Sequence, residues 1–182
     1  MSIKTFIGCM FSGKTSELIS EYTRWTNIGR KVIMINYSMD DRYGDDNNVY
    51  SHNKLKVPCM KAEKLMDVSH DILCNADVIL INEGQFFDDI VDFCTLWCET
   101  YNKYIVVCGL DGNFKRAPFK NMSNLISISD EVYKLKALCK KCNDGTPAIF
   151  SKLVTNNNSG SDILIGGADM YMPLCRKCYN NK

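Results

Sequence analysis

The sequence predicts an α/β protein: a doubly wound, mostly parallel sheet flanked by helices, followed by a small C-terminal β-hairpin lobe built around four cysteines. Three observations lead to this class. Apolar strand-like runs alternate with helix-like segments over residues 1–138, which is the pattern of parallel βαβ units. A strand–loop–helix segment of the P-loop type opens the chain. Beyond residue 138, two C-x-x-C pairs enclose short strand-like runs, so residues 139–182 form the lobe.

The loop in question matches G-x-x-x-x-G-K-[ST] at every position, and its residues are Gly8, Cys9, Met10, Phe11, Ser12, Gly13, Lys14 and Thr15. In such a loop the glycines allow tight turns that point backbone N–H groups at phosphate oxygens. The lysine reaches the β/γ-phosphates, and the hydroxyl can ligate Mg²⁺. An expected strand over 4–7 and an expected helix over 16–28 flank the loop, and the helix N-terminus adds a positive dipole end. The pattern predicts a nucleoside triphosphate site.

The remaining elements follow in chain order. The helix over 16–28 is expected to pack on the sheet through an apolar face of Leu18, Ile19, Tyr22, Trp25 and Ile28. We expect strands over 32–37, 76–81 and 104–109, helices over 62–74 and 88–101, and a polar loop over 39–53. Because parallel strands end at one edge of their sheet, Gly8, Glu83 and the segment after Gly109 should meet there as a ligand site.

Composition narrows the function. The 182 residues include 22 basic and 21 acidic side chains, for a net charge of +1, whereas a nucleic-acid binder usually carries a basic surplus. No stretch approaches the ~18 consecutive apolar residues of a membrane span, and the brief N-terminal apolar run shows no export signal. We therefore expect a cytoplasmic protein whose cysteines stay reduced. Six cysteines should be small buried hydrophobes, namely Cys9, Cys59, Cys74, Cys94, Cys98 and Cys108.

The other four cysteines form two pairs, Cys139-x-x-Cys142 and Cys175-x-x-Cys178. Two such pairs supply four soft thiolates for a closed, structural Zn²⁺ site. A hairpin of strands over 148–154 and 162–165 fits between them, and the metal would stabilise a lobe that is too small for a core of its own. The alternatives are a redox C-x-x-C pair and four unliganded core cysteines.

Glu83 is the candidate catalytic residue. It follows Asn82 at the end of the apolar run 76–81. A carboxylate at that strand end, beside the expected γ-phosphate, can accept the proton of an attacking hydroxyl. The alternative is a charge on a surface turn.

Five segments together resemble the type II thymidine kinases, the cytosolic enzymes of animals and poxviruses. They are the loop at 8–15, Glu83-Gly84-Gln85-Phe86-Phe87, Leu110-Asp111-Gly112-Asn113-Phe114, Gly166-Gly167-Ala168-Asp169-Met170-Tyr171 and Cys175-Arg176-Lys177-Cys178. The resemblance covers nearly the whole chain in the family's order, and the short C-terminal segment is most like the poxvirus members. It implies transfer of the γ-phosphate of ATP to the 5′-hydroxyl of thymidine, giving dTMP and ADP, by a homotetramer.

The resemblance also implies roles for individual residues. Glu83 matches the general base, residues 8–15 the ATP phosphate site, and Asp40 and Arg42 residues near the phosphates and Mg²⁺. Phe114 matches an aromatic that packs on thymine, with pocket-wall residues at Met10, Phe86, Phe119 and Tyr171. The strand whose backbone reads the base edge matches Asp162, Ile163, Leu164, Ile165 and Gly166. The structural zinc site, which holds a lasso-like loop over the nucleoside, matches Cys139, Cys142, Cys175 and Cys178.

Two positions depart from the family's pattern: Asn82 stands where Asp is usual, and Cys9 where Pro is favoured. An amide at position 82 can accept a hydrogen bond from a metal-bound water but adds no charge, which leaves the support of Mg²⁺ open. One rival function is a P-loop NTPase whose zinc lobe binds nucleic acid, and the near-neutral charge speaks against it. The other is a zinc-stabilised binding module with a degenerate nucleotide site, for which Asn82 is the main argument.

Overall fold

The computed structural model describes residues 1–40, 48–50, 56–155 and 170–181. Its centre is a six-stranded sheet in the order β5-β2-β6-β7-β1-β8, with parallel pairing throughout. The strands are β1 (Ser2–Gly8), β2 (Val32–Tyr37), β5 (Met60–Ala62), β6 (Val78–Ile81), β7 (Tyr104–Gly109) and β8 (Glu131–Leu135). The four strands predicted from apolar runs are therefore confirmed, and β5 and β8 extend the sheet at its two edges.

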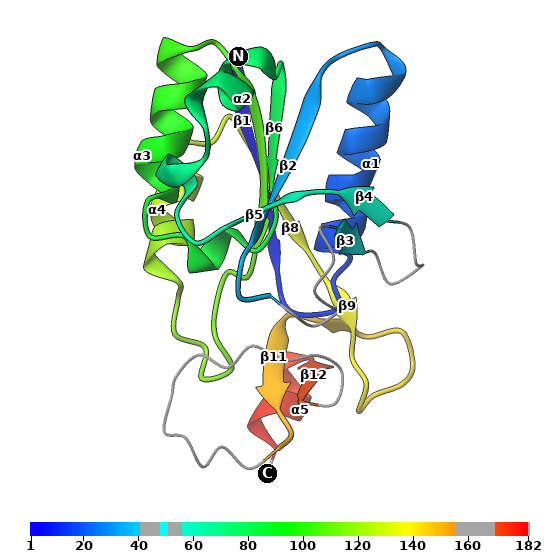
Figure 1. Ribbon diagram of the computed structural model, residues 1–182. Helices are drawn as coiled ribbons and strands as arrows, with labels where there is room; N and C mark the ends of the chain where they lie inside the picture. Colours follow the sequence, from blue (N-terminus) through cyan, green and yellow to red (C-terminus); the bar gives the residue numbers. More distant parts are fainter. Residues whose placement is uncertain (41–47, 51–55, 156–169, 182) are drawn as a thin grey trace.

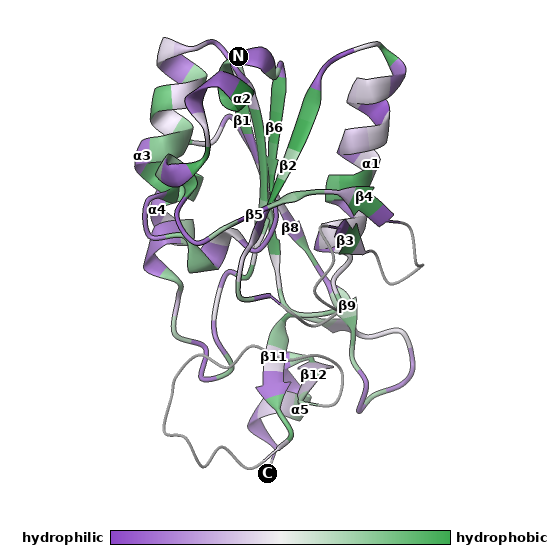
Figure 2. Ribbon diagram, in the orientation of Figure 1, coloured by the Kyte–Doolittle hydropathy of each residue, from purple (hydrophilic) through white to green (hydrophobic). Residues whose placement is uncertain are grey.

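Helices cover both faces of this sheet, as Figure 1 shows. On one face lies α1 (Lys14–Asn27), and on the other lie α2 (His70–Asn75), α3 (Ile90–Thr95), the π-helical turn η3 (Leu96–Thr100) and α4 (Lys120–Ile128). Figure 2 shows that apolar residues concentrate on the strands and on the inner sides of these helices. The α/β class predicted for the main body is confirmed.

Side-chain alternation along the strands explains why the central ones are apolar throughout. On β6, Val78 and Leu80 pack with Leu18 of α1, whereas Ile79 and Ile81 pack with Phe93 of α3. Successive residues of a strand point to opposite faces, so a strand with helices on both sides has no solvent-facing positions.

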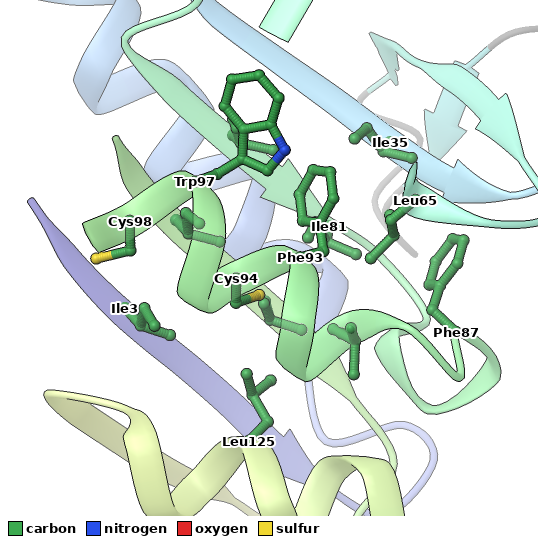
Figure 3. Packing of buried hydrophobic residues seen from close by; sticks show 14 of the residues in the cluster. Ile3, Ile35, Leu65, Ile81, Phe87, Phe93, Cys94, Trp97, Cys98 and Leu125 are labelled. Atoms are coloured by element: carbon green, nitrogen blue, oxygen red, sulfur yellow. The ribbon is translucent and has the colours of Figure 1, made fainter. Parts of the chain in front are cut away.

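The larger core lies between the sheet and the α3–α4 layer. Figure 3 shows Phe93, Cys94 and Trp97 of the α3–η3 segment directed at the sheet, with Leu125 of α4 closing the cluster. Within the region predicted as a helix over 88–101, the buried residues are Ile90, Phe93, Cys94, Trp97 and Cys98. Two short 3-10 turns adjoin this layer, η1 (Leu65–Asp67) and η2 (Gly84–Phe86).

A small lobe lies beyond the carboxyl edge of the sheet (Figure 1). Its elements are β9 (Ala137–Leu138), β10 (Pro147–Ala148), β11 (Phe150–Leu153), β12 (Tyr171–Leu174) and α5 (Arg176–Asn180). β9 pairs antiparallel with β10, and β11 pairs antiparallel with β12. The strand predicted over 162–165 lies outside the described residues, and the partner of β11 that the structure shows is β12.

The structure corrects several expectations about local structure. The helix predicted over 62–74 is replaced by the end of β5, by η1 and by the shorter α2. The cause is visible in the backbone: residues 60–62 join the sheet beside β2, and Val68 and Ser69 are extended between the two helical turns. Residues 48–50 of the predicted polar loop form a strand, β3 (Asn48–Tyr50), which pairs antiparallel with β4 (Lys56–Pro58) beyond the predicted end of that loop.

Burial on α1 also differs from the prediction. Ile28 is 68% exposed because it lies past the end of the helix, whereas Glu21 is only 5% exposed. Glu21 is buried with partners, since its carboxylate accepts hydrogen bonds from Arg24 Nη1 at 2.9 Å and Trp25 Nε1 at 3.1 Å. Cys74 is exposed rather than buried, unlike the other five isolated cysteines. Among the described helices, none has the length and apolarity needed to cross a bilayer.

Candidate active site

The segment 8–15 connects a central strand to a helix, as the sequence predicts, because Gly8 ends β1 and Lys14 begins α1. Gly13 has φ 87°, a left-handed conformation that glycine adopts at little cost. At Gly8 φ is 149°, and an added Cβ would lie 2.4 Å from the carbonyl oxygen of Leu135. Both glycines are therefore required by the shape of the turn.

Two polar side chains of this turn are arranged in a way that suits an anion. Ser12 Oγ is buried and lacks a hydrogen-bond partner within the described part of the chain, which costs free energy unless a ligand or water pairs with it. Lys14 Nζ donates to the carbonyl oxygen of Cys9 at 2.8 Å, so the ammonium lies across the turn. Burial lowers the pKa of Lys14, and the charge of Glu83 is the largest opposing influence. The residues present thus fit a phosphate group.

Glu83 lies immediately beyond β6 and is held by Gln85. Glu83 as a residue is 9% exposed, and Gln85 Nε2 donates to Glu83 Oε2 at 2.5 Å. The other end of the amide, Gln85 Oε1, accepts from the backbone N–H of Leu110 at 2.9 Å. Gln85 therefore connects the end of β6 to the segment after β7, so two of the three strand ends expected to meet are joined directly.

Asn82 belongs to a buried chain of polar side chains that crosses three strand ends. The thiol of Cys108 donates to Asn82 Oδ1 at 3.0 Å, and Asn82 Nδ2 donates to Asn36 Oδ1 at 2.9 Å. Asn36 Nδ2 in turn donates to Asp40 Oδ2 at 3.4 Å. The donors all point the same way, from β7 through β6 and β2 to the Asp40 carboxylate. This hydrogen-bonded chain therefore ends on a carboxylate, the kind of hard oxygen ligand that Mg²⁺ prefers.

Aromatic side chains lie on either side of these strand ends. The Phe86 ring packs on Tyr37 with centroids 5.0 Å apart. Phe114 follows β7 and faces Tyr171 of β12, with centroids 6.5 Å apart. Phe114 is half-buried and Tyr171 is buried. Of the predicted pocket wall, the structure brings Phe114 and Tyr171 together, whereas Phe119 packs into the core under α4.

The four cysteines of the two C-x-x-C pairs converge on one point. Their sulfur atoms all lie within 4.8 Å of one another, and a tetrahedral Zn²⁺ with Zn–S bonds of ~2.3 Å places its sulfurs about 3.8 Å apart. Burial would raise the pKa of Cys139, but backbone N–H groups, with that of Cys175 first, lower it to about 6, whereas hydrogen bonding to Cys178 and Cys139 raises the pKa of Cys142 to about 12. The donor set therefore fits a soft divalent metal ion.

The cysteine lobe is joined directly to the 8–15 turn. The backbone N–H of Met10 donates to Ser151 Oγ at 2.9 Å, and Cys9 Sγ donates to the carbonyl oxygen of Ala148 at 3.5 Å. Cys9 also shares a buried cluster with Cys139 and Cys175. The lobe thus forms one wall of the candidate site.

Some of the predicted site residues cannot be placed. Arg42 and the whole strand from Asp162 to Gly166 lie outside the described residues. Sequence reasoning assigned no individual role to Gln85, Asn36 or Ser151. Gln85 lies in one of the five segments that resemble the thymidine kinases, and this is a signal that could have identified it. Asn36 and Ser151 have no local sequence signal, because their hydrogen-bond partners are distant in the chain.

Comparison with known proteins agrees with this geometry. The family model described as thymidine kinase matches residues 1–179. The thymidine kinase of Vaccinia virus (strain Ankara) is 44% identical over 97% of this chain and 96% of that protein. The thymidine kinase of Raccoon poxvirus is 42% identical over 99% of this chain and 97% of that protein. The thymidine kinase of Variola virus is 42% identical over 97% of this chain and 96% of that protein. The chain therefore belongs to the thymidine kinase family.

Proposed function

We propose that this protein is an ATP-dependent thymidine kinase that transfers the γ-phosphate of ATP to the 5′-hydroxyl of thymidine. The observation that carries the proposal is one juxtaposition. In a chain 44% identical to a poxvirus thymidine kinase, the 8–15 turn and the buried Glu83 carboxylate lie at the same edge of the sheet, close enough for Glu83 to act on the pKa of Lys14.

The donor half of the site is the turn at the start of α1. Backbone amides of residues 8–15, the Ser12 hydroxyl and the Lys14 ammonium would bind the phosphates of ATP, and the N-terminal end of α1 adds its dipole. Stabilising the charge that develops on the transferred group is the main task in phosphoryl transfer. The burial of Ser12 Oγ without a partner in the described residues supports this assignment.

Thr15 and Asp40 are the residues that would hold Mg²⁺, with Asn82 acting through Asn36 on the position of Asp40. When bound, the ion would neutralise charge on the β- and γ-phosphates. Arg42 is proposed to contribute further positive charge, by the resemblance alone.

Glu83 is the proposed general base. Its carboxylate would accept the proton of the 5′-hydroxyl as that oxygen attacks the γ-phosphorus and ADP leaves. The hydrogen bond from Gln85 Nε2 to one carboxylate oxygen sets the orientation of the carboxylate. Gln85 is thus a positioning residue for Glu83.

The acceptor half of the site is formed by aromatic residues from two parts of the chain. Phe114 would stack on the thymine ring, beside Tyr171, Phe86 and Met10. An apolar cavity wall with a few polar groups is typical of nucleoside pockets. The backbone of Asp162 to Gly166 is proposed to read the base edge.

The cysteine cluster is proposed to hold one structural zinc ion, since all four sulfurs are close enough to share it. A homotetrameric assembly, which the resemblance implies, and the cytoplasmic location expected from the sequence complete the proposal. A nucleic-acid-dependent NTPase is less well supported, because the net charge of +1 provides no basic surplus.

The decisive experiment is a phosphorylation panel with Mg-ATP and thymidine, deoxyuridine, deoxycytidine, deoxyguanosine and deoxyadenosine. We expect dTMP as the main product, with deoxyuridine the only other acceptor of note. Phosphorylation of no nucleoside, together with ATP hydrolysis stimulated by polynucleotides, would replace the proposal with the rival function.

A further inference from the structure

The last helix of the chain touches the loop that carries Phe114. Tyr179, in α5, donates its phenolic hydroxyl to the backbone carbonyl of Phe114, across 65 positions in the sequence. Both residues are half-buried. This contact connects the cysteine lobe to the segment that follows β7.

A stacked cation strengthens the same contact. The Arg116 guanidinium lies over the Tyr179 ring at 4.7 Å and over the Phe150 ring at 5.6 Å. Arg116 Nη1 also donates to Asn180 Oδ1 at 3.1 Å. The planar guanidinium is suited to this geometry, because it can stack on a ring and donate in its plane at the same time.

The loop that receives these contacts is internally braced. Asn113 Oδ1 accepts from the backbone N–H groups of Lys115 at 3.0 Å and Ala117 at 2.9 Å. The backbone N–H of Asn113 donates to the Ala117 carbonyl at 2.9 Å. Residues 113–117 therefore hold one shape, so contacts at Phe114 and Arg116 set the position of the whole segment.

The other end of the connection is the cysteine cluster itself. α5 begins directly after Cys175, whose sulfur caps the helix by accepting from the N–H of Cys178 at 3.4 Å. Tyr179 is the next residue, and its N–H donates to the carbonyl of Cys175 at 2.9 Å. The orientation of the Tyr179 ring thus depends on the geometry of the cysteines.

We propose that Tyr179 and Arg116 are positioning residues through which the metal-binding cysteines set the place of Phe114 in the thymidine pocket. The inference rests on the proposed function, because it takes Phe114 as the residue that stacks on thymine. In this arrangement the cysteine cluster stabilises the lobe and also influences the affinity for thymidine, the phosphate acceptor.

The first test is Tyr179→Phe, which removes one hydroxyl and keeps the ring under Arg116. We expect the KM for thymidine to rise about fivefold, as the loss of one hydrogen bond implies, with kcat and the KM for ATP unchanged. Arg116→Lys, which keeps the positive charge but removes the planar guanidinium group, should also raise the KM for thymidine. Tyr133→Phe is the matched control, since its hydroxyl contacts Glu131 on the exposed edge strand β8.

Hydrogen exchange of the peptide 110–119 gives a second readout that needs no activity. We expect faster exchange in Tyr179→Phe than in the wild type. Removal of metal with a chelator should speed hydrogen exchange of this peptide in the wild type. In Tyr179→Phe the same treatment should speed exchange by less, because the hydrogen bond from Tyr179 to Phe114 is already absent.

The outcomes separate the two proposals. If the wild type phosphorylates no thymidine, the proposed function fails, while the exchange experiment still decides whether α5 positions the loop. An unchanged thymidine KM in an active Tyr179→Phe protein overturns the inference. So does a loss of zinc or a rise in both KM values, since either would mean that Tyr179 only maintains the fold.

Discussion

Glu83 occupies an unusual backbone position for a charged residue. Its φ of 56° lies in the left-handed region, which is uncommon for residues other than glycine and is concentrated at functional sites. Buried packing maintains this conformation: at the next residue, an added Cβ on Gly84 would lie 2.6 Å from Val107 Cγ1. The turn therefore fits tightly against β7 and aims the carboxyl group where Gln85 can hold it.

Replacing Glu83 by Gln should separate chemistry from binding. The amide is nearly isosteric and can still accept from Gln85, but it cannot take a proton from the 5′-hydroxyl. We expect kcat to fall by about 100-fold or more, with the binding of ATP and thymidine retained in equilibrium titrations. Glu99→Gln, on the exposed surface of η3, is the control. A near-normal kcat would exclude Glu83 as the base.

For the substitution Asn82→Asp, the structure leads to a different prediction from the sequence. From the sequence alone, restoring the family's Asp would be expected to keep or raise activity. In the structure, Asn82 donates to Asn36 Oδ1, and a carboxylate cannot do so. Asn36 would have to turn its amide over, which would direct its oxygen at Asp40 instead of its Nδ2. Asn82→Asp should therefore destabilise the protein by about 1–3 kcal/mol near neutral pH.

The pH dependence of this variant checks the cause. A carboxyl group at the buried position 82 has a raised pKa in the folded protein, so the folded state binds more protons than the unfolded state as the pH falls. The loss in melting temperature should be largest at neutral pH and shrink toward pH ~4, the unfolded value for Asp. The exposed Asn102→Asp serves as control. A loss in melting temperature that is the same at all pH values would contradict charge burial as the cause.

At the level of individual residues, the sequence analysis identified those whose role or burial is indicated by their neighbours in the chain. Lys14 and Glu83 stand in short motifs, and five of the six isolated cysteines follow their apolar neighbours into the core. Ile28 was predicted to be buried, but α1 ends at Asn27 and Ile28 is exposed. The burial of Glu21, in the middle of α1, has no local signal because it depends on distant partners such as Lys4, whose Nζ lies 3.3 Å from Glu21 Oε1. The contact of Tyr179 with Phe114 left no sequence signal for the same reason.

Among elements, the central strands were predictable because burial on both faces makes them continuously apolar. β5 and β8 lie at the sheet edges and are short or solvent-exposed, with Val132 40% and Tyr133 45% exposed, so hydrophobicity did not mark them. The break between η1 and α2 depends on where β5 joins the sheet. These features are set by tertiary pairing, which overrides local propensity.

The cysteine lobe is the element whose stability should depend on metal. Its buried cluster within residues 137–175 consists of two alanines, two cysteines and Leu174, which is too little apolar surface to fold the lobe by burial alone. We expect about one zinc ion per chain. Chelation should lower the melting temperature by about 10 °C or more, since structural zinc contributes several kcal/mol. Cys142→Ser should lose the zinc, whereas Cys74→Ser, at an exposed position outside the cluster, should retain it. A metal-free protein of native stability would contradict the assignment.

In the molecule as a whole, one buried cluster includes residues from both sides of the boundary expected at residue 138. Cys9 of the β1–α1 turn packs with Ala148 and Cys175 of the lobe, so the donor site is partly built on the cysteine lobe. The proposed nucleotide site and the proposed metal site therefore share one buried cluster. The two parts should unfold together rather than in separate transitions.

Ser151→Ala tests this connection between the lobe and the donor site. Ser151 is 5% exposed, and its Oγ accepts from the backbone N–H of Met10 at 2.9 Å; in alanine that buried N–H loses its acceptor, at a cost of about 1–3 kcal/mol. We expect the melting temperature to fall by about 3–8 °C and the KM for ATP to rise, while zinc content stays at the wild-type level. Ser127→Ala, at an exposed position near the end of α4, should change neither quantity. If Ser151→Ala lowers the melting temperature but leaves the KM for ATP unchanged, the hydrogen bond joins the two parts without shaping the phosphate site, and the donor half is independent of the lobe.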